Sequence, residues 1–162
     1  MLINFVVQMT NSTKLLLLFL LFNFGGLALG SYLQGSIADN NWYAALDRAP
    51  WTPAGWVFGA AWVFIMVAYS FYLTRLSVAI NHRFISLLFV ASWVLNVVWS
   101  PLFFQFHYTE LALVVLILLF LCILTFFLLF GRRMGIFSFL LLPYLVWLGI
   151  AFSLNWYVIF KN

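Results

Sequence analysis

Few side chains in this 162-residue sequence could carry out acid–base or metal chemistry. His82 and His107 are separated by one apolar run long enough to cross a bilayer, so they fall on opposite membrane faces and cannot share a metal ion. Glu110 lies three residues after His107, a spacing more typical of helix capping than of an acid–base pair. The single cysteine, Cys122, excludes a disulfide within the chain. We therefore predict no catalytic residue, no metal site and no required cofactor.

Polar side chains that could bind a ligand lie inside apolar segments and recur at helical spacing. Three sets combine aromatic residues with an amide or small residue three or four positions apart, so each set shares one helix face. The sets are Trp93, Asn96, Ser100 and Phe103; Tyr144, Trp147, Ala151 and Asn155; and Trp51, Gly55, Gly59 and Trp62. Helix packing alone explains one such set. Three sets favour a shared pocket with flat apolar walls, which suits a rigid, planar, hydrophobic ligand.

Composition indicates that these segments lie in lipid. The sequence is 67% hydrophobic and 6% charged, with a mean hydropathy of +1.16, whereas a soluble domain has roughly 25% charged residues. A globule of this length exposes a large fraction of its residues, and this chain has too few polar residues to cover it. The net charge of +4 comes from basic residues scattered between apolar runs, so it does not indicate nucleic-acid binding.

Five apolar runs have the length of about 20 residues that a helix needs to cross a bilayer. They cover about 15–33, 51–73, 84–106, 111–130 and 136–160. We predict an all-α membrane protein, a bundle of five transmembrane helices over residues 15–162, preceded by an N-terminal polar extension at residues 1–14. The first run also resembles a secretory signal peptide. It continues through Tyr32 and Leu33, which favours a retained helix.

The distribution of basic residues predicts how the chain is oriented. One side of the five runs carries Lys14, Arg75, Arg83, Arg132 and Arg133, and the other carries Arg48 and Lys161. The positive-inside rule then places the N-terminus in the cytoplasm. The longest connection, residues 35–50, lies on the far side and is the predicted lid or binding loop. Within it we expect Asp47 and Arg48 to be solvated or hydrogen-bonded to the loop backbone.

Glycine pairs predict where helices approach closely. Gly26 and Gly30 in the first run, and Gly55 and Gly59 in the second, have the small-xxx-small spacing of packed membrane helices. The same spacing would allow helices of two chains to pack closely in a homodimer. An assembly partner that binds no small molecule is therefore one alternative function.

Three stretches resemble the translocator protein family, also called tryptophan-rich sensory proteins or peripheral benzodiazepine receptors. They are W-Y-A-A-L-D-R-A-P-W-T-P at 42–53, L-N-V-V-W-S-P-L-F-F at 95–104, and P-Y-L-V-W with L-N-W at 143–147 and 154–156. The resemblance covers residues 15–162. It implies a five-helix bundle, often a homodimer, in a bacterial cell membrane or, in a eukaryote, the mitochondrial outer membrane. The family's loop usually has a lysine and more prolines than residues 48–54 of this chain.

The resemblance also implies a ligand and its contacts. Family members bind porphyrins and haem-related tetrapyrroles, benzodiazepine-type drugs and, in animal members, cholesterol, in a pocket beneath the first loop. Carried over by motif, the contacts are Tyr43, Trp51, Asn96, Trp99, Trp147 and Ala151, and the helical spacing adds Asn155. We predict a receptor or carrier for such a ligand. A second alternative is an enzyme that degrades porphyrin with light and oxygen, because pocket tryptophans could be oxidised.

The end of the last run fits a loose cholesterol-binding pattern. Leu154, Tyr157 and Lys161 have the permitted spacings. A leucine, an interfacial tyrosine and a terminal lysine also occur at many span ends, so we favour the interpretation that they anchor the helix at the interface.

Overall fold

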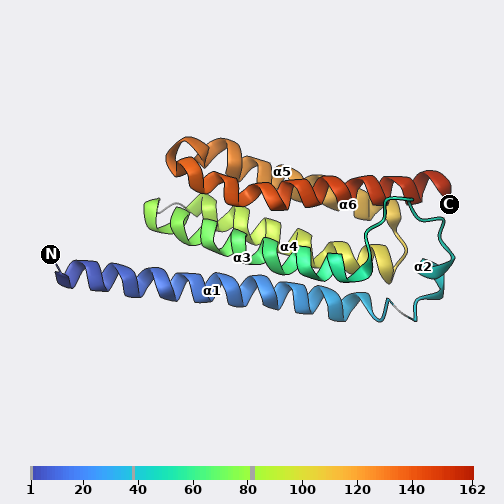
Figure 1. Ribbon diagram of the computed structural model, residues 1–162, viewed down its shortest axis with the longest axis horizontal. Coiled ribbons are helices and arrows are strands. Elements are labelled where there is room, and N and C mark those ends of the chain that lie inside the picture. Colours follow the sequence, from blue (N-terminus) through green and yellow to red (C-terminus); the bar gives the residue numbers. More distant parts are fainter. Residues whose placement is uncertain (1, 38, 81–82) are drawn as a thin grey trace.

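The computed structural model describes residues 2–37, 39–80 and 83–162, with side chains from residue 11 onward, and the regular structure among them is helical. The long helices are α1 (Leu2–Gln34), α3 (Gly55–Ala79), α4 (Arg83–Phe104), α5 (Thr109–Met134) and α6 (Leu142–Lys161). The short helix α2 (Asn41–Ala45) lies in the loop after α1, and the 3-10 helix η1 (Gly135–Leu141) joins α5 to α6. The long helices run side by side, and the start of α1 and the end of α6 lie at opposite ends of the bundle (Figure 1).

Four stretches of the described residues are long and apolar enough to cross a membrane. They are Asn11–Gln34, Gly55–Ala79, Arg83–Phe104 and Thr109–Lys161. The last stretch has 53 residues and contains both α5 and α6, which is more than twice the length that one crossing needs. The predicted all-α membrane fold is confirmed, and the structure is compatible with five spans.

Two helices begin at positions that differ from those predicted. α1 begins at Leu2, so the stretch expected as a polar extension is helical from that residue onward. α3 begins at Gly55, whereas the second run was expected to be helical from Trp51. The Thr52 amide donates to the Ala49 carbonyl (2.9 Å) and closes a turn there. Pro53 follows this turn, and a proline favours an extended conformation in the residue before it. The helix therefore begins only after Pro53.

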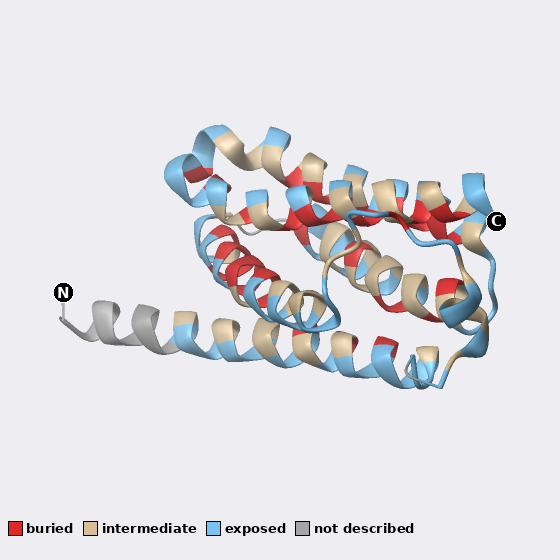
Figure 2. Cartoon of the chain, turned by 45° about the vertical axis from the view of Figure 1, so that its right-hand side comes forward, coloured by how far each residue is buried: buried red, intermediate tan, exposed pale blue. Residues whose placement is uncertain are grey.

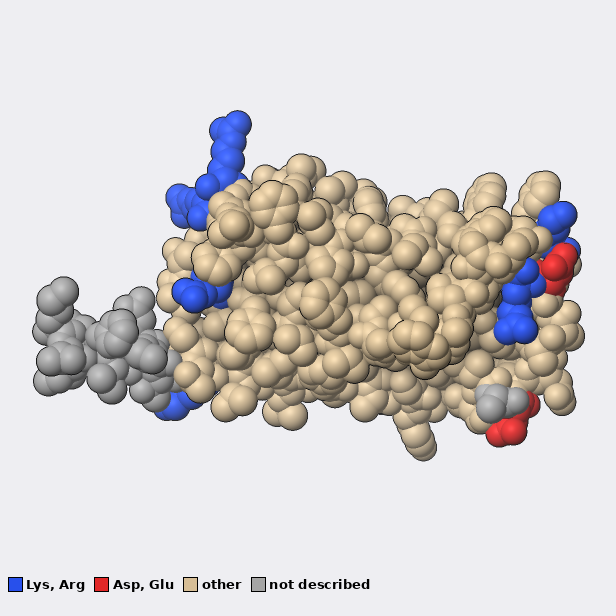
Figure 3. Space-filling model, viewed as in Figure 1, with Lys and Arg blue, Asp and Glu red and all other residues tan. Residues whose placement is uncertain are grey.

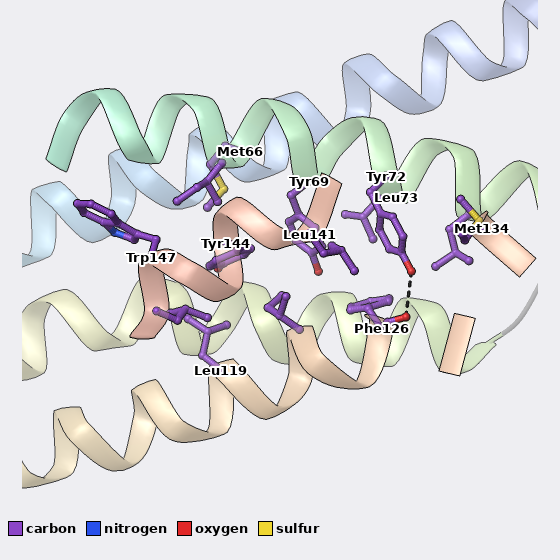
Figure 4. Packing of buried hydrophobic residues seen from close by; sticks show 14 of the residues in the cluster. Met66, Tyr69, Tyr72, Leu73, Leu119, Phe126, Met134, Leu141, Tyr144 and Trp147 are labelled. Atoms are coloured by element: carbon purple, nitrogen blue, oxygen red, sulfur yellow. Dashed lines mark hydrogen bonds between the residues drawn. The ribbon is translucent and has the colours of Figure 1, made fainter. Parts of the chain in front are cut away.

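Buried and partly buried hydrogen bonds tie neighbouring helices together within the apolar stretches. They join Asn23 Nδ2 to Ser70 Oγ (2.8 Å, α1 to α3), the Tyr69 and Ser92 hydroxyls (2.9 Å, α3 to α4), Asn96 Nδ2 to the Tyr144 hydroxyl (2.9 Å, α4 to α6), and the Tyr72 hydroxyl to the Phe126 carbonyl (3.1 Å, α3 to α5). Figure 4 shows the last of these. Lipid supplies no hydrophobic force between helices, so packing and such bonds, worth about 0.6–1.7 kcal/mol each, hold the bundle together.

The packed core lies where α3 meets α5, η1 and α6. Tyr69, Leu73 and Leu141 in this region are at most 2% exposed (Figure 4). Buried residues face the interior of the bundle (Figure 2). The outer surface also carries large apolar side chains, such as Leu21 and Trp56, which are 72% and 76% exposed. An apolar exterior around a packed interior is the arrangement that lipid as solvent allows.

Charged residues lie toward the two ends of the bundle (Figure 3). Near the end that holds the start of α1 are Lys14, Arg75, Arg83, Arg132 and Arg133, whereas Arg48 and Lys161 belong to the other end. The structure thus separates the two groups of basic residues that the sequence assigned to opposite membrane faces, and the cytoplasmic N-terminus stays a prediction.

Two glycines bring α1 close to α4. A Cβ atom on Gly26 would lie 2.6 Å from Trp93 Nε1, and one on Gly30 would lie 3.5 Å from the Val97 carbonyl oxygen. Trp93 Nε1 donates a hydrogen bond to the Phe22 carbonyl of α1 (2.8 Å). Because Gly26 has no side chain, the Trp93 indole can pack directly against α1.

The second glycine pair has a different environment. A Cβ atom on Gly55 or Gly59 would meet nothing within 4 Å. In the part of the chain that the structure describes, no helix packs closely on this pair, so the helix-packing role expected for it finds no partner within the protomer. Both glycines instead border a hollow in the bundle.

Candidate ligand-binding site

A cavity of about 470 Å³ lies among α1, α3 and α4, at the end of the bundle that carries the first loop. Its volume falls within the range of about 300–1,000 Å³ typical of small-molecule sites. Aromatic, small and a few polar residues line it. They include Gly30 and Gln34 of α1, Tyr43, Arg48 and Thr52 of the loop, Gly55, Phe58, Gly59 and Trp62 of α3, and Asn96, Trp99, Ser100 and Phe104 of α4.

A smaller chamber of about 40 Å³ extends the site toward α6. Tyr43, Trp99 and Phe104 line both the cavity and the chamber. On the α6 side the chamber is bounded by Ala151 and Asn155. Residues of α1, the loop, α3, α4 and α6 thus line two adjoining hollows that share part of their walls.

The first half of the loop is fastened to the end of α4. Asn40 caps α2 by accepting a hydrogen bond from the Tyr43 amide (2.9 Å), and its Nδ2 donates to the Phe104 carbonyl (2.8 Å). The Trp42 ring stacks on His107 with centroids 4.1 Å apart. These contacts hold Tyr43 at the mouth of the cavity.

The second half of the loop is fastened on both sides of Arg48. The Asp47 amide donates to Oδ1 of Asn162 at the end of α6 (2.9 Å), and Thr52 Oγ1 donates to the carbonyl of buried Ala49 (2.6 Å). The Arg48 guanidinium carbon lies 5.4 Å from the centre of the Tyr43 ring. Arg48 is exposed, as expected for a loop residue, but it also lines the cavity and the chamber, which the sequence did not indicate.

Comparison with known proteins identifies the family of this chain. The model of the TspO/MBR family matches residues 17–161. The chain belongs to the TspO/MBR family. It is 34% identical over 125 residues to tryptophan-rich protein TspO of Bacillus cereus, covering 73% of this chain and 78% of that protein. It is 32% identical over 124 residues to tryptophan-rich protein TspO of Archaeoglobus fulgidus (75% and 80%) and 29% identical over 121 residues to protein CrtK of Rhodobacter capsulatus (72% and 76%). Membership and the apolar helices make this an integral, multi-pass membrane protein.

The structure brings five of the seven predicted ligand contacts of this TspO/MBR protein to the site. Tyr43, Asn96 and Trp99 line the main cavity, and Ala151 and Asn155 line the chamber. Trp147 lies behind the wall and is 7% exposed. Its ring packs edge-on against two cavity-lining rings, Phe58 at 5.3 Å and Trp62 at 6.5 Å between centroids.

Trp51 lies outside the cavity wall. It is 55% exposed, its Nε1 donates to Ser153 Oγ (3.2 Å), and its ring packs edge-on against Tyr157 (5.4 Å). The spacing that grouped Trp51 with Gly55 assumed one continuous helix. Because α3 begins only at Gly55, helical periodicity does not extend back to Trp51.

Asn155 fastens α6 to the first turn of α5. It is 2% exposed. In the amide orientation that satisfies both neighbours, its nitrogen donates to the Thr109 carbonyl (3.1 Å) and its oxygen accepts from the Leu113 amide (3.2 Å). Asn155 therefore borders the chamber while its polar atoms serve helix association.

The residues of the cholesterol-like pattern do not form one lipid-facing surface. Leu154 lines the chamber inside the bundle, Tyr157 packs against Trp51, and Lys161 is exposed in the last turn of α6. This placement supports the interpretation of Tyr157 and Lys161 as residues of an interfacial span end.

The described residues contain no group of three or more histidine, cysteine, aspartate or glutamate side chains that could hold a metal ion. His107, the histidine that the structure describes, stacks on Trp42. His82 lies outside the described residues.

Trp99 carries a buried hydrogen-bond donor without an acceptor. Its Nε1 has no partner among the described residues, and its ring stacks on Phe103 with centroids 5.9 Å apart. An unpaired buried donor costs about 1–3 kcal/mol of folding free energy. The indole is thus held in the cavity wall by ring packing and not by a hydrogen bond.

Trp99→Phe is expected to change the free energy of unfolding by less than about 1 kcal/mol, because removing an unsatisfied donor offsets part of the lost packing. Thermal unfolding in detergent measures this change. Tyr144→Phe is the comparison, because it removes a hydroxyl that accepts a hydrogen bond from Asn96. A larger loss for Trp99→Phe than for Tyr144→Phe would contradict the assignment of Nε1 as unpaired.

Proposed function

We propose that this TspO/MBR protein is a membrane receptor or carrier that binds a planar hydrophobic ligand, a porphyrin or haem-related tetrapyrrole, in the cavity under the first loop. The observation that carries this proposal is the aromatic cavity of about 470 Å³ at the loop end of the bundle. The proposal includes five membrane spans, with α5 and α6 crossing separately, and association of two chains as a homodimer.

Several properties of the cavity support a planar ligand. Phe58, Trp62 and Trp99 supply flat apolar surfaces from two helices. Aromatic rings bind other rings well by offset or edge-on stacking. Asn96 and Ser100 add a few polar groups that could orient a ligand. The same walls would accept benzodiazepine-type drugs or a sterol, as the family resemblance implies.

A titration of the purified protein with metal-free protoporphyrin IX tests the proposal. Trp62 and Trp99 line the cavity, so a bound porphyrin should quench tryptophan fluorescence. We expect saturable quenching with one porphyrin per chain and a shifted porphyrin absorbance band. Detergent micelles without protein are the control for nonspecific partitioning.

Quenching that rises linearly with porphyrin and never saturates would contradict the proposal. It would favour the alternative of an assembly partner without a small-molecule ligand. Slow conversion of bound porphyrin to a new absorbing product under light would instead favour the degrading enzyme.

A further inference from the structure

Arg48 is the one charged side chain among the residues that line the cavity and its chamber in the described part of the chain. The other polar lining residues are uncharged amides and hydroxyls, such as Gln34, Thr52 and Asn96. A single cation in an otherwise neutral wall gives the site a fixed electrostatic preference. It favours a ligand that carries a negative charge.

No carboxylate side chain of the described residues lines the cavity or its chamber beside this cation. Asp39 accepts a hydrogen bond from the Ser36 hydroxyl (2.7 Å), and the backbone of Asp47 is bonded to Asn162. The group that faces the Arg48 guanidinium is the Tyr43 ring. The N–H bonds of a guanidinium point outward in its own plane. A guanidinium that lies over an aromatic face can therefore still donate hydrogen bonds to a planar acceptor such as a carboxylate.

The loop presents Arg48 in a defined position. Hydrogen bonds fix the residue before it to Asn162 and the residue after it to Thr52. Both bonds join the loop to itself or to the last residue of the chain, so the backbone of Arg48 is held from two sides. A pre-organised donor loses little conformational freedom when a ligand arrives, which makes its contribution to affinity larger.

We propose that Arg48 is a specificity-determining residue that binds a carboxylate of the ligand, so that the cavity selects planar apolar molecules bearing an acidic group. This inference rests on the function proposed above and narrows its ligand class. The apolar ring of the ligand lies among Phe58, Trp62 and Trp99, and its carboxylate pairs with the guanidinium at the loop end.

The location of Arg48 makes this pairing physically reasonable. A carboxylate deep in the hydrocarbon would be expensive to bury. Arg48 is exposed and lies in the loop outside the long helices, where a carboxylate can keep part of its hydration. Guanidinium and carboxylate groups also match each other in two parallel hydrogen bonds.

Two porphyrins that differ only in their acidic groups test the inference. Metal-free protoporphyrin IX carries two carboxylates, and its dimethyl ester carries none. We expect the wild-type protein to bind the free acid roughly tenfold more tightly than the ester, the size of effect that one hydrogen-bonded ion pair provides. Arg48→Gln should lose this preference, because the variant should bind the free acid more weakly and bind the ester with unchanged affinity.

Matched variants separate the pairing from general charge effects. Lys161→Gln removes a cation at the same end of the bundle that does not line the cavity, and it should keep the full preference. Arg48→Lys should keep part of it, because an ammonium attracts a carboxylate without matching its two oxygens. Comparing each variant with wild type in one detergent cancels the different partition of the two porphyrins into micelles.

Each outcome has a distinct meaning. Equal binding of acid and ester by the wild-type protein, or equal weakening of both by Arg48→Gln, would overturn the role of Arg48 and leave the proposed function standing. Failure of the wild-type protein to bind either porphyrin would overturn the proposed function and this inference with it.

Discussion

Gly26→Leu is expected to destabilise the bundle by about 2–4 kcal/mol, through overpacking and the loss of one hydrogen bond. A Cβ atom at this position would lie 2.6 Å from Trp93 Nε1, closer than any ordinary contact. The Trp93 indole would have to leave its place and give up its bond to the Phe22 carbonyl. Because that indole joins α4 to α1, the two helices would separate locally. Thermal unfolding of the detergent-purified protein measures the loss.

Gly25→Leu is the control for this substitution. It makes the same chemical change one residue earlier, where an added Cβ would meet nothing within 4 Å. We expect its stability to stay within about 1 kcal/mol of wild type, since leucine also favours the helix over glycine. Equal loss of stability in both variants would show that the Gly26 contact is not special. Loss of a dimer by Gly26→Leu without any loss of protomer stability would place the contact between chains instead.

The membrane helices could be predicted because lipid imposes a simple requirement on sequence. Each span needs about 20 apolar residues with its backbone bonded internally, and the runs of this chain meet that requirement. The start of α3 could not be predicted as well. Trp51 and Gly55 have helical spacing, but Thr52 closes a turn on Ala49, and the helix begins only after Pro53. Spacing alone cannot show where such a turn replaces a helix.

The candidate site was predicted in part for a related reason. Asn96 and Trp99 lie on a regular helix, where spacing defines the inward face. Arg48 lies in a loop beside Asp47, and in the sequence this pair resembles an ordinary solvated turn. The loop that carries Arg48 is hydrogen-bonded from Asp47 to Asn162, which are 115 residues apart. Contacts over such a separation leave no local signal in a single sequence.

The buried amides show the same limit. Asn96 and Asn155 both sit at helical spacing from aromatic residues, and both were predicted to contact the ligand. In the structure Asn96 donates to Tyr144 across the bundle, whereas the amide of Asn155 joins α6 to the backbone of α5. A polar residue in a membrane helix predicts an inward face. Which neighbour its polar atoms bond is decided by the packing of the helices.

Gly59→Leu is expected to weaken protoporphyrin binding at least about tenfold while leaving the free energy of unfolding within about 1 kcal/mol of wild type. Gly59 lines the cavity, and an added Cβ there would meet nothing within 4 Å, so the first carbon of a leucine side chain touches no neighbour and the rest can extend into the cavity. Fluorescence quenching measures the affinity, and thermal unfolding measures stability. The leucine would occupy the volume that we assign to the ligand.

Gly149→Leu is the matched control, because Gly149 is also a helical glycine with nothing within 4 Å but lies on α6 beside a separate hollow formed with α5. It should bind porphyrin as wild type does. If Gly59→Leu also bound like wild type, the ligand could not lie along α3. If it gave a monomer that still bound porphyrin, Gly59 would face a second chain, and the open space beside α3 would belong to a dimer interface. Fluorescence quenching together with the oligomeric state in size-exclusion chromatography therefore decides between a glycine that makes room for a ligand and one that makes room for a partner helix.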